Sequence, residues 1–225
     1  MLGNTTIKVP PLESGDRLTR PEFERRYQAM PHLKKAELIE GVVYVASPVR
    51  MANHSRLHAQ IVGWLMVYSA ATPGVDLADN ATVRLDIDNE PQPDALLRLE
   101  PEVGGNSRIS EDDYVEGALE LITEIATSSA SYDLNDKLNA YRRNGVQEYI
   151  VWQIYENNLD WFSLKEGNYV NLQPDATGVI RSHLFPGLWL SVTALLEGNL
   201  AEVLAVLQQG LQSTHQAFVE RLSSQ

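Results

Sequence analysis

The segment from Ala118 to Ala126 reads ALELITEIA and constrains the fold more than any other part of the chain. Its alternating pattern predicts a β-strand with one apolar face. That face carries Leu119, Leu121, Thr123 and Ile125. The opposite face carries Glu120, Ile122, Glu124 and Ala126. A charge inside so apolar a strand must be solvated, paired or bound to a metal, so the glutamates are candidate functional residues.

The other periodic segments predict helices and strands in alternation around this strand. Apolar residues recur at helical spacing from Leu57 to Tyr68, and a second helix is expected over 133–144, closed by Gly145. Further strands are expected over 83–88, 94–99 and 146–152. The core order is then helix-strand-strand-strand-helix-strand, which is an α/β fold with a central sheet.

Additional elements are expected on both sides of this core. A capping box at Thr19 and Glu22 predicts a helix to about Met30, and a hairpin over 37–46 follows it. Another hairpin is expected over 159–172, followed by an amphipathic helix over 200–211 that packs on the sheet or forms a subunit contact. The sequence thus predicts one domain over 1–225, with a core at about 37–152 and a C-terminal extension over 153–225.

Composition excludes several classes of protein. Eighteen Lys and Arg against thirty Asp and Glu give a net charge of −12, which argues against a surface built entirely for nucleic acid or anionic membrane. Because cysteine is absent, there is no disulfide framework, thiolate metal site or cysteine nucleophile. The longest apolar stretch, around 61–71, falls short of the ~18 residues of a membrane span. A cytoplasmic protein without a membrane partner is expected.

Asp94 and Glu124 are the best candidates for a metal site. Asp94 follows Pro93 at the start of one expected strand, and Glu124 lies in the next. An Asp and a Glu on adjacent strands can converge on a hard cation such as Mg²⁺, which takes one or two protein carboxylates. A glycosidase pair of Glu120 and Glu124 is disfavoured, because four residues of strand span ~13 Å and that chemistry uses ~5–9.5 Å.

Several motifs together resemble one nuclease family. They are Pro93-Asp94, the ELIEG, GALELITEIATSS, YDLNDK and GVQEY segments, and the FPGLWL segment over 185–190. Jointly they resemble the Uma family of bacterial endonucleases, within the restriction-endonuclease-like PD-(D/E)xK superfamily. The resemblance implies a restriction-endonuclease-like core, here with an added N-terminal hairpin and C-terminal helices. It also implies a metal-dependent endonuclease that hydrolyses DNA phosphodiester bonds.

The resemblance assigns roles to individual residues. It implies that Asp94 and Glu124 bind Mg²⁺, or Mn²⁺ in its place. The superfamily lysine stands two residues after the glutamate, where this chain has Ala126, and the family places it on the following helix at Lys137. There Lys137 would hold the attacking water and neutralise charge on the phosphate. Asp133 shares a helix face with Lys137 and is a candidate supporting residue.

Glu120, His58 and Glu37 are further candidate supporting residues. Glu120 shares the face of Glu124, either supporting the site from its edge or simply solvated. His54 and His58 have zinc-like spacing, but the segment HSRLH lacks the glutamate of a zinc protease. His58 instead resembles a recurrent histidine of the family, placed to meet phosphate at a helix start. Glu37 also recurs in the family, without an assigned role.

DNA is the expected partner, bound through a local basic rim. Its candidate residues are Lys34, Lys35, Arg50, Arg56, Arg142 and Arg143. A homodimer is expected, because cutting both strands of a duplex is simplest with two sites related by a two-fold axis. Two alternatives stay open: a non-catalytic interaction protein that retains the fold, with which Ala126 is compatible, or a phosphoesterase acting on RNA or nucleotides.

Overall fold

A central six-stranded sheet organises the chain, with strand order β11-β10-β9-β8-β5-β3. The computed structural model describes residues 9–45, 55–127 and 129–224. The strands of the sheet are β3 (Val75–Asp79), β5 (Ala95–Leu99), β8 (Leu121–Ala126), β9 (Glu148–Gln153), β10 (Asn158–Lys165) and β11 (Asn168–Asn171). Only β8 and β9 are parallel, and the other neighbours are antiparallel. A parallel pair needs a crossover, which the helices between β8 and β9 provide.

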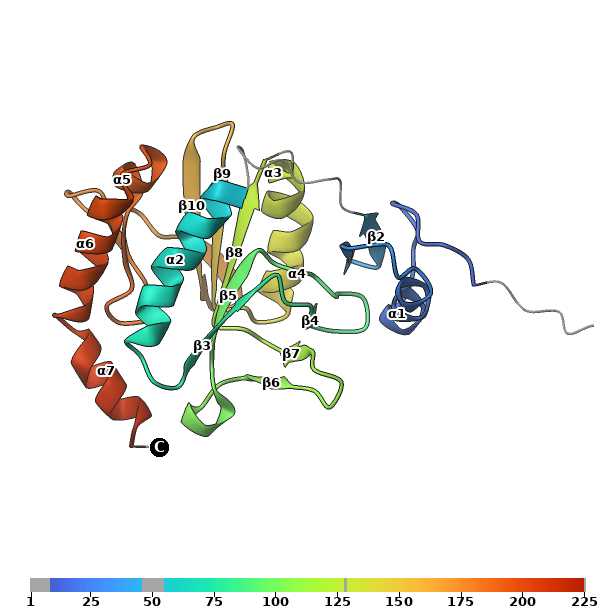
Figure 1. Cartoon of the computed structure of the whole chain (residues 1–225), viewed down its shortest axis with the longest axis horizontal. Helices are drawn as coiled ribbons and strands as arrows, with labels where there is room; N and C mark the ends of the chain where they lie inside the picture. The colour runs from blue at the N-terminus through green and yellow to red at the C-terminus, as the bar shows by residue number, and fades with distance from the viewer. Residues whose placement is uncertain (1–8, 46–54, 128, 225) are drawn as a thin grey trace, which may run out of the picture.

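Helices cover both faces of the sheet (Figure 1). α2 (Arg56–Ala70) lies on one face, where Leu121 and Ile125 of β8 join its core cluster. The crossover lies on the other face and consists of α3 (Ala130–Tyr132), the π-helical turn η3 (Asp133–Lys137) and α4 (Leu138–Arg143). Ile122 and Ala126 of β8 belong to the second core cluster, on this face. The alternation expected for this strand is therefore confirmed. Leu119 is the exception, because it precedes β8 and packs in the second cluster.

The predicted core order is confirmed as α2, β3, β5, β8, α4 and β9, but the first strand was wrongly placed. β3 takes the position predicted for 83–88, while β4 (Val83–Arg84) is short and belongs to another sheet. After β4 the chain bends, because the amides of Leu85 and Asp86 both bond to the carbonyl of Asn89. β6 (Ser107–Ile109) and β7 (Val115–Gly117) complete that small sheet, after the 3₁₀ turn η2 (Pro101–Val103).

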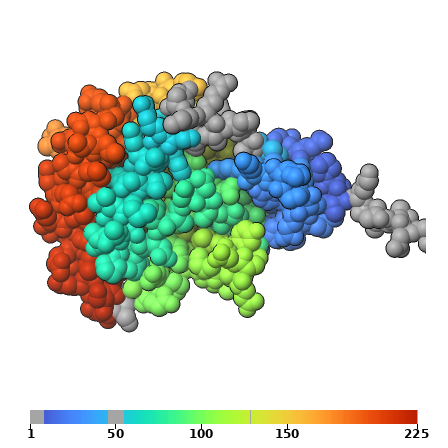
Figure 2. All heavy atoms as spheres, viewed as in Figure 1, coloured from blue at the N-terminus to red at the C-terminus, as the bar shows by residue number. Residues whose placement is uncertain are grey.

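The N-terminal segment forms a separate layer beside α3 and α4, coloured blue in Figures 1 and 2. It contains α1 (Arg20–Gln28) and the hairpin of β1 (Ala36–Ile39) and β2 (Val42–Val45). Glu40 and Gly41 have φ of 52° and 72°, as a tight two-residue hairpin turn requires. Thr19 is the N-cap of α1 through its carbonyl, which accepts from Glu22 and Phe23; its side chain makes no capping bond, so the expected capping box does not form.

The C-terminal segment packs outside α2. It contains β12 (Val179–Arg181), β13 (Trp189–Ser191), α5 (Val192–Leu196), α6 (Leu200–Leu211) and α7 (His215–Leu222). The apolar stripe of α6 is buried within the chain against α2 and β13, at Val203, Val206, Leu207 and Gly210. Among the described helices, none is long and apolar enough to cross a membrane.

Candidate functional site

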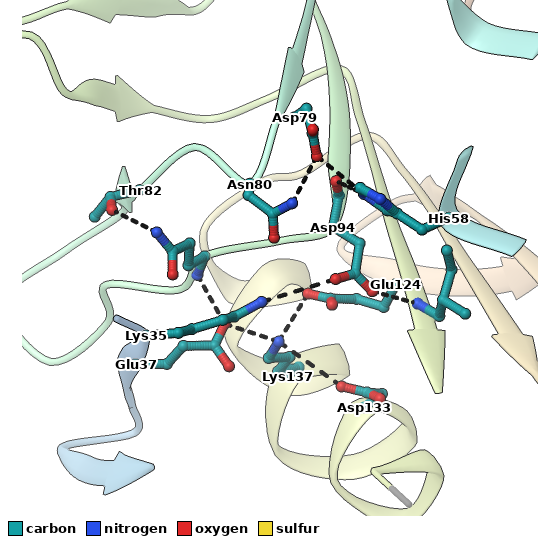
Figure 3. Close-up of polar contacts among 12 residues, drawn as sticks. Lys35, Glu37, His58, Asp79, Asn80, Thr82, Asp94, Glu124, Asp133 and Lys137 are labelled. Carbon is teal, nitrogen blue, oxygen red and sulfur yellow. Dashed lines mark hydrogen bonds and ion pairs between the residues drawn. The ribbon is translucent and has the colours of Figure 1, made fainter. Parts of the chain in front are cut away.

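Asp94 and Glu124 face each other across two neighbouring strands. Ala95 pairs with Thr123, so continuing the register by one residue sets Asp94 opposite Glu124 on the same face of the sheet. The backbone N–H of Ile125 donates to Asp94 Oδ2 at 2.8 Å, which fixes the carboxylate against β8. Both side chains are buried, with relative exposures of 6% and 4% (Figure 3). The strand register therefore brings the two predicted carboxylates together.

Lys137 reaches the same point from the π-helical turn. Its Nζ lies 2.8 Å from Glu124 Oε1, 2.9 Å from Glu37 Oε1 and 3.8 Å from Asp133 Oδ1. Burial by itself lowers the pKa of Lys137, but the carboxylates of Glu124, Glu37 and Asp133 together hold it well above its ordinary value. The surrounding carboxylates therefore favour the charged ammonium form, which ties two elements of the chain to β8.

Glu124 also accepts a hydrogen bond from α4. The Tyr141 hydroxyl donates to Glu124 Oε1 at 2.9 Å, beside the contact with Lys137. Burial raises the pKa of Glu124 above its ordinary value, Lys137 opposes the rise, and Asp94, Asp133 and Glu37 add to it. The carboxylate is thus oriented by two donors but surrounded by an excess of negative charge.

The N-terminal hairpin contributes two side chains to the site. Glu37 accepts from the backbone N–H of Gln92 at 2.7 Å as well as from Lys137. Lys35, two residues earlier, places its Nζ 3.7 Å from Asp94 Oδ1. Glu37 was expected only as a family residue without a role, and Lys35 only as part of a basic rim. Their two-residue spacing beside a predicted strand is the signal that both point the same way.

The other expected supporting residues have separate positions. His58 Nε2 lies 2.8 Å from the carbonyl oxygen of Asp94 and 2.9 Å from Asp79 Oδ1, at the start of α2. Glu120 lies before β8, at the strand end away from Glu124, and accepts from the amides of Leu99 and Asn106. It therefore holds a loop instead of the candidate site. His54 lies outside the described residues.

Tyr132 is a neighbour that the sequence did not single out. Its ring centroid lies 5.4 Å from Lys137 Nζ and 4.1 Å from that of Tyr44 in the hairpin, with the two rings tilted by 37°. Its hydroxyl is buried and has no hydrogen-bond partner in the described part of the chain. The YDLNDK segment thus supplies the Tyr132 ring beside Lys137, as well as Asp133 and Lys137 themselves.

The expected basic rim is only partly assembled. Arg143 pairs with Glu40, and Arg142 donates to the carbonyl of Gly167, both at the far end of α4 from Lys137. Lys34 and Arg56 are exposed, whereas Arg50 lies outside the described residues. Within the described part, Lys35 is the rim residue that contacts Asp94.

The chemistry of the site fits a divalent cation. Four carboxylates (Glu37, Asp94, Glu124 and Asp133, the acidic cluster) contact two ammonium groups: Asp94 that of Lys35, and the other three that of Lys137. When all are ionised, two negative charges remain uncompensated. Carboxylate oxygens are the ligands that Mg²⁺ prefers, and it needs only one or two of them. No group of three or more His, Asp or Glu side chains is arranged around one metal position in the described ranges.

Comparison with known proteins identifies the family. The model of the Uma2 family, described as "Putative restriction endonuclease", matches residues 20–193. The chain belongs to the Uma2 family. Its matched region includes the hairpin, both strands of the candidate site and the crossover helices. The resemblance read from the motifs is confirmed, and so is the restriction-endonuclease-like fold.

A solved structure shares this Uma2 fold. It is described as a "putative nuclease belonging to DUF820" from Anabaena variabilis ATCC 29413, with a TM-score of 0.59 and 15% identity. The match covers 77% of this chain and 96% of that one, and at this identity it shows the fold alone. No curated protein matches the chain.

Proposed function

We propose that this Uma2 protein is a metal-dependent endonuclease that hydrolyses DNA phosphodiester bonds. The observation that carries the proposal is the pairing of Asp94 and Glu124 across β5 and β8, with Lys137 bonded to Glu124. Two carboxylates and an ammonium group at one point are the parts that phosphodiester hydrolysis requires, namely a metal position and a fixed positive charge. The family match supports nuclease chemistry.

The roles follow from the contacts. Asp94 and Glu124 would hold Mg²⁺ or Mn²⁺, which polarises a phosphate oxygen and lowers the pKa of bound water when present. Lys137 fixes the orientation of Glu124 and stabilises, from beside it, the negative charge that develops on the phosphate. Glu37 and Asp133 hold Lys137 in place. Tyr141 keeps the carboxylate of Glu124 from rotating.

The decisive experiment replaces each carboxylate by its amide. Asp94→Asn and Glu124→Gln should reduce cleavage of duplex DNA by at least about 100-fold, with unchanged circular dichroism spectra. In the parent, millimolar Mn²⁺ should raise the melting temperature, because a ligand bound only by the folded state stabilises it. That rise should vanish in both variants. Glu102→Gln, an exposed acid in η2, is the matched control. A variant that cleaves as fast as the parent would overturn the proposal.

A non-catalytic interaction protein is the second candidate function. Ala126 in place of the superfamily lysine and the burial of Lys137 favour it. It predicts no cleavage and no Mn²⁺-dependent rise in melting temperature at millimolar ion. Screening single-stranded RNA and nucleotides beside duplex DNA distinguishes a phosphoesterase with the same ligands.

We also propose that the active form is a homodimer, since double-strand cleavage needs two sites. The apolar stripe of α6 is already covered by α2 and β13, so a dimer would use another surface. Light scattering on the full chain tests the assembly, and a monomer at micromolar concentration would contradict it.

A further inference from the structure

Lys35 approaches the acidic cluster from its solvent-exposed side. Its Nζ lies 3.7 Å from Asp94 Oδ1, which is an ion pair longer than a hydrogen bond (Figure 3). The Lys35 side chain is 25% exposed, whereas that of Lys137 is 3% exposed. Of the two ammonium groups, therefore, only that of Lys35 combines contact with Asp94 and access to solvent.

Lys137 is already committed to protein partners. Its ammonium group contacts Glu124 and Glu37 at hydrogen-bond distance, with Asp133 behind them and the Tyr132 ring beside it. Turning it toward a substrate would leave buried carboxylates unpaired, which is strongly unfavourable. Lys137 thus acts from behind Glu124.

The hairpin fixes Lys35 at the site. Ala36 pairs with Val45 in the hairpin ladder, and Lys35 immediately precedes it. Side chains two residues apart in an extended chain share a side, and Glu37 is anchored to both Lys137 and Gln92. The anchor on Glu37 therefore directs Lys35 to the same side, toward Asp94.

We propose that Lys35 contacts the scissile phosphate directly, as a catalytic cation supplied by the start of the N-terminal hairpin; the inference rests on the proposed nuclease function. During hydrolysis a water oxygen forms the new P–O bond, the ester P–O bond breaks, and a proton from water goes to the leaving oxygen. Lys35 transfers no proton. It pairs with a non-bridging phosphate oxygen and stabilises the charge that increases there.

The test compares Lys35→Met, which keeps chain length and removes charge, with Lys35→Arg and with Lys165→Met. Lys165 is an exposed lysine at the far end of β10 and is the matched control. Lys35→Met should lower kcat by about 10²-fold. Lys35→Arg keeps the positive charge, so its kcat should lie between those of Lys35→Met and the parent. Lys165→Met should have the kcat of the parent.

Two readouts are independent of turnover. Titration with Mn²⁺ alone, followed by melting temperature, should show Lys35→Met binding at least as tightly as the parent, because a cation near Asp94 has been removed. The second readout is made in the Glu124→Gln protein without metal. Adding Lys35→Met to it should lower the affinity for duplex DNA, measured by fluorescence anisotropy. Its slope against log salt should become shallower by about 0.9. A merely structural lysine would weaken Mn²⁺ binding and leave that slope unchanged.

The outcomes separate this inference from the proposed function. If the parent cleaves and Lys35→Met cleaves equally fast, or loses Mn²⁺ binding, the role of Lys35 is overturned and the nuclease proposal stands. If the parent neither cleaves nor binds Mn²⁺, both proposals fall. Slow cleavage by Lys35→Met with intact Mn²⁺ binding supports both.

Discussion

At the scale of single residues, the stability of the site depends on Lys137. Its charge is shared among Glu37, Glu124 and Asp133, which are all buried. Lys137→Met should destabilise the protein by about 3–5 kcal/mol, because it leaves buried carboxylates without a partner. Urea unfolding of the metal-free protein measures this loss.

The matched double variant identifies the cause. Adding Glu124→Gln to Lys137→Met removes one of the stranded charges, so part of the lost stability should return. A double variant more stable than Lys137→Met would show that the loss comes from uncompensated charge. If the loss came from packing, the destabilisations of the two substitutions would add. A Lys137→Met protein as stable as the parent would contradict the buried ion-pair arrangement.

The sequence pointed to most residues of the candidate site, but not to the contacts that they make with the N-terminal hairpin. Asp94 and Glu124 could be selected because they stand at the start of one apolar strand and inside the next, whereas Lys137 and its neighbour Asp133 followed from the resemblance to the Uma family. Lys35 could not be placed there, since it comes from a hairpin whose docking depends on Glu37 and on contacts far along the chain. A local pattern carries no information about such long-range contacts.

At the scale of elements, Arg84 joins α1 to the loop before β5, because its Nε lies 2.8 Å from Glu24 Oε1 and 3.9 Å from Glu90 Oε2. Burial, followed by the adjacent Glu24 carboxyl, raises the pKa of Glu90 to about 8, against the pull of Arg84. The backbone of Glu90 also bridges to Leu38 of β1. The N-terminal layer is therefore attached at a residue whose buried carboxyl group has a raised pKa.

This attachment predicts a pH-dependent stability. Because the folded pKa of Glu90 lies above the unfolded value of 4.5, its contribution is fully present below pH 4.5 and lost as pH rises through about 8. Glu90→Gln mimics the neutral form and should raise stability at pH 8.5 by at least about 1 kcal/mol, or ~2–4 °C in melting temperature.

The measurement is a pair of thermal melts at pH 5.5 and pH 8.5. The parent should lose more stability between them than Glu90→Gln does, while Glu102→Gln should follow the parent. Equal pH dependence in all three proteins would show that Glu90 is ionised without cost in the fold.

Elements were predictable where periodicity extended over many residues. The helix of α2, the hairpin turn at Glu40 and Gly41, and the strands β8 and β9 were all expected from local pattern. The segment 83–88 alternates as well, yet hydrogen bonds to Asn89 bend it out of the sheet. Alternation describes a strand that could form, and competing turn contacts decide whether it does.

At the scale of the whole molecule, the C-terminal segment is itself held together by a close approach of α6 to the backbone before β13. A Cβ added at Gly210 of α6 would lie 2.2 Å from the carbonyl oxygen of Gly187 and 2.9 Å from the ring of Trp189. α6 can approach Gly187 and β13 this closely only because position 210 lacks a side chain. The amphipathic stripe predicted the helix, but not which surface it would cover.

One substitution made in two helices tests this packing. Gly210→Ala should destabilise the protein by about 1–3 kcal/mol, because the overpacked methyl forces α6 away from Gly187. Gly63→Ala in α2, where an added Cβ meets nothing within 4 Å, should instead stabilise it by about 0.5–1 kcal/mol through helix propensity. Urea unfolding of both variants separates these signs. If Gly210→Ala were stabilising too, α6 would not be held closely against Gly187, and this account of its packing would be wrong.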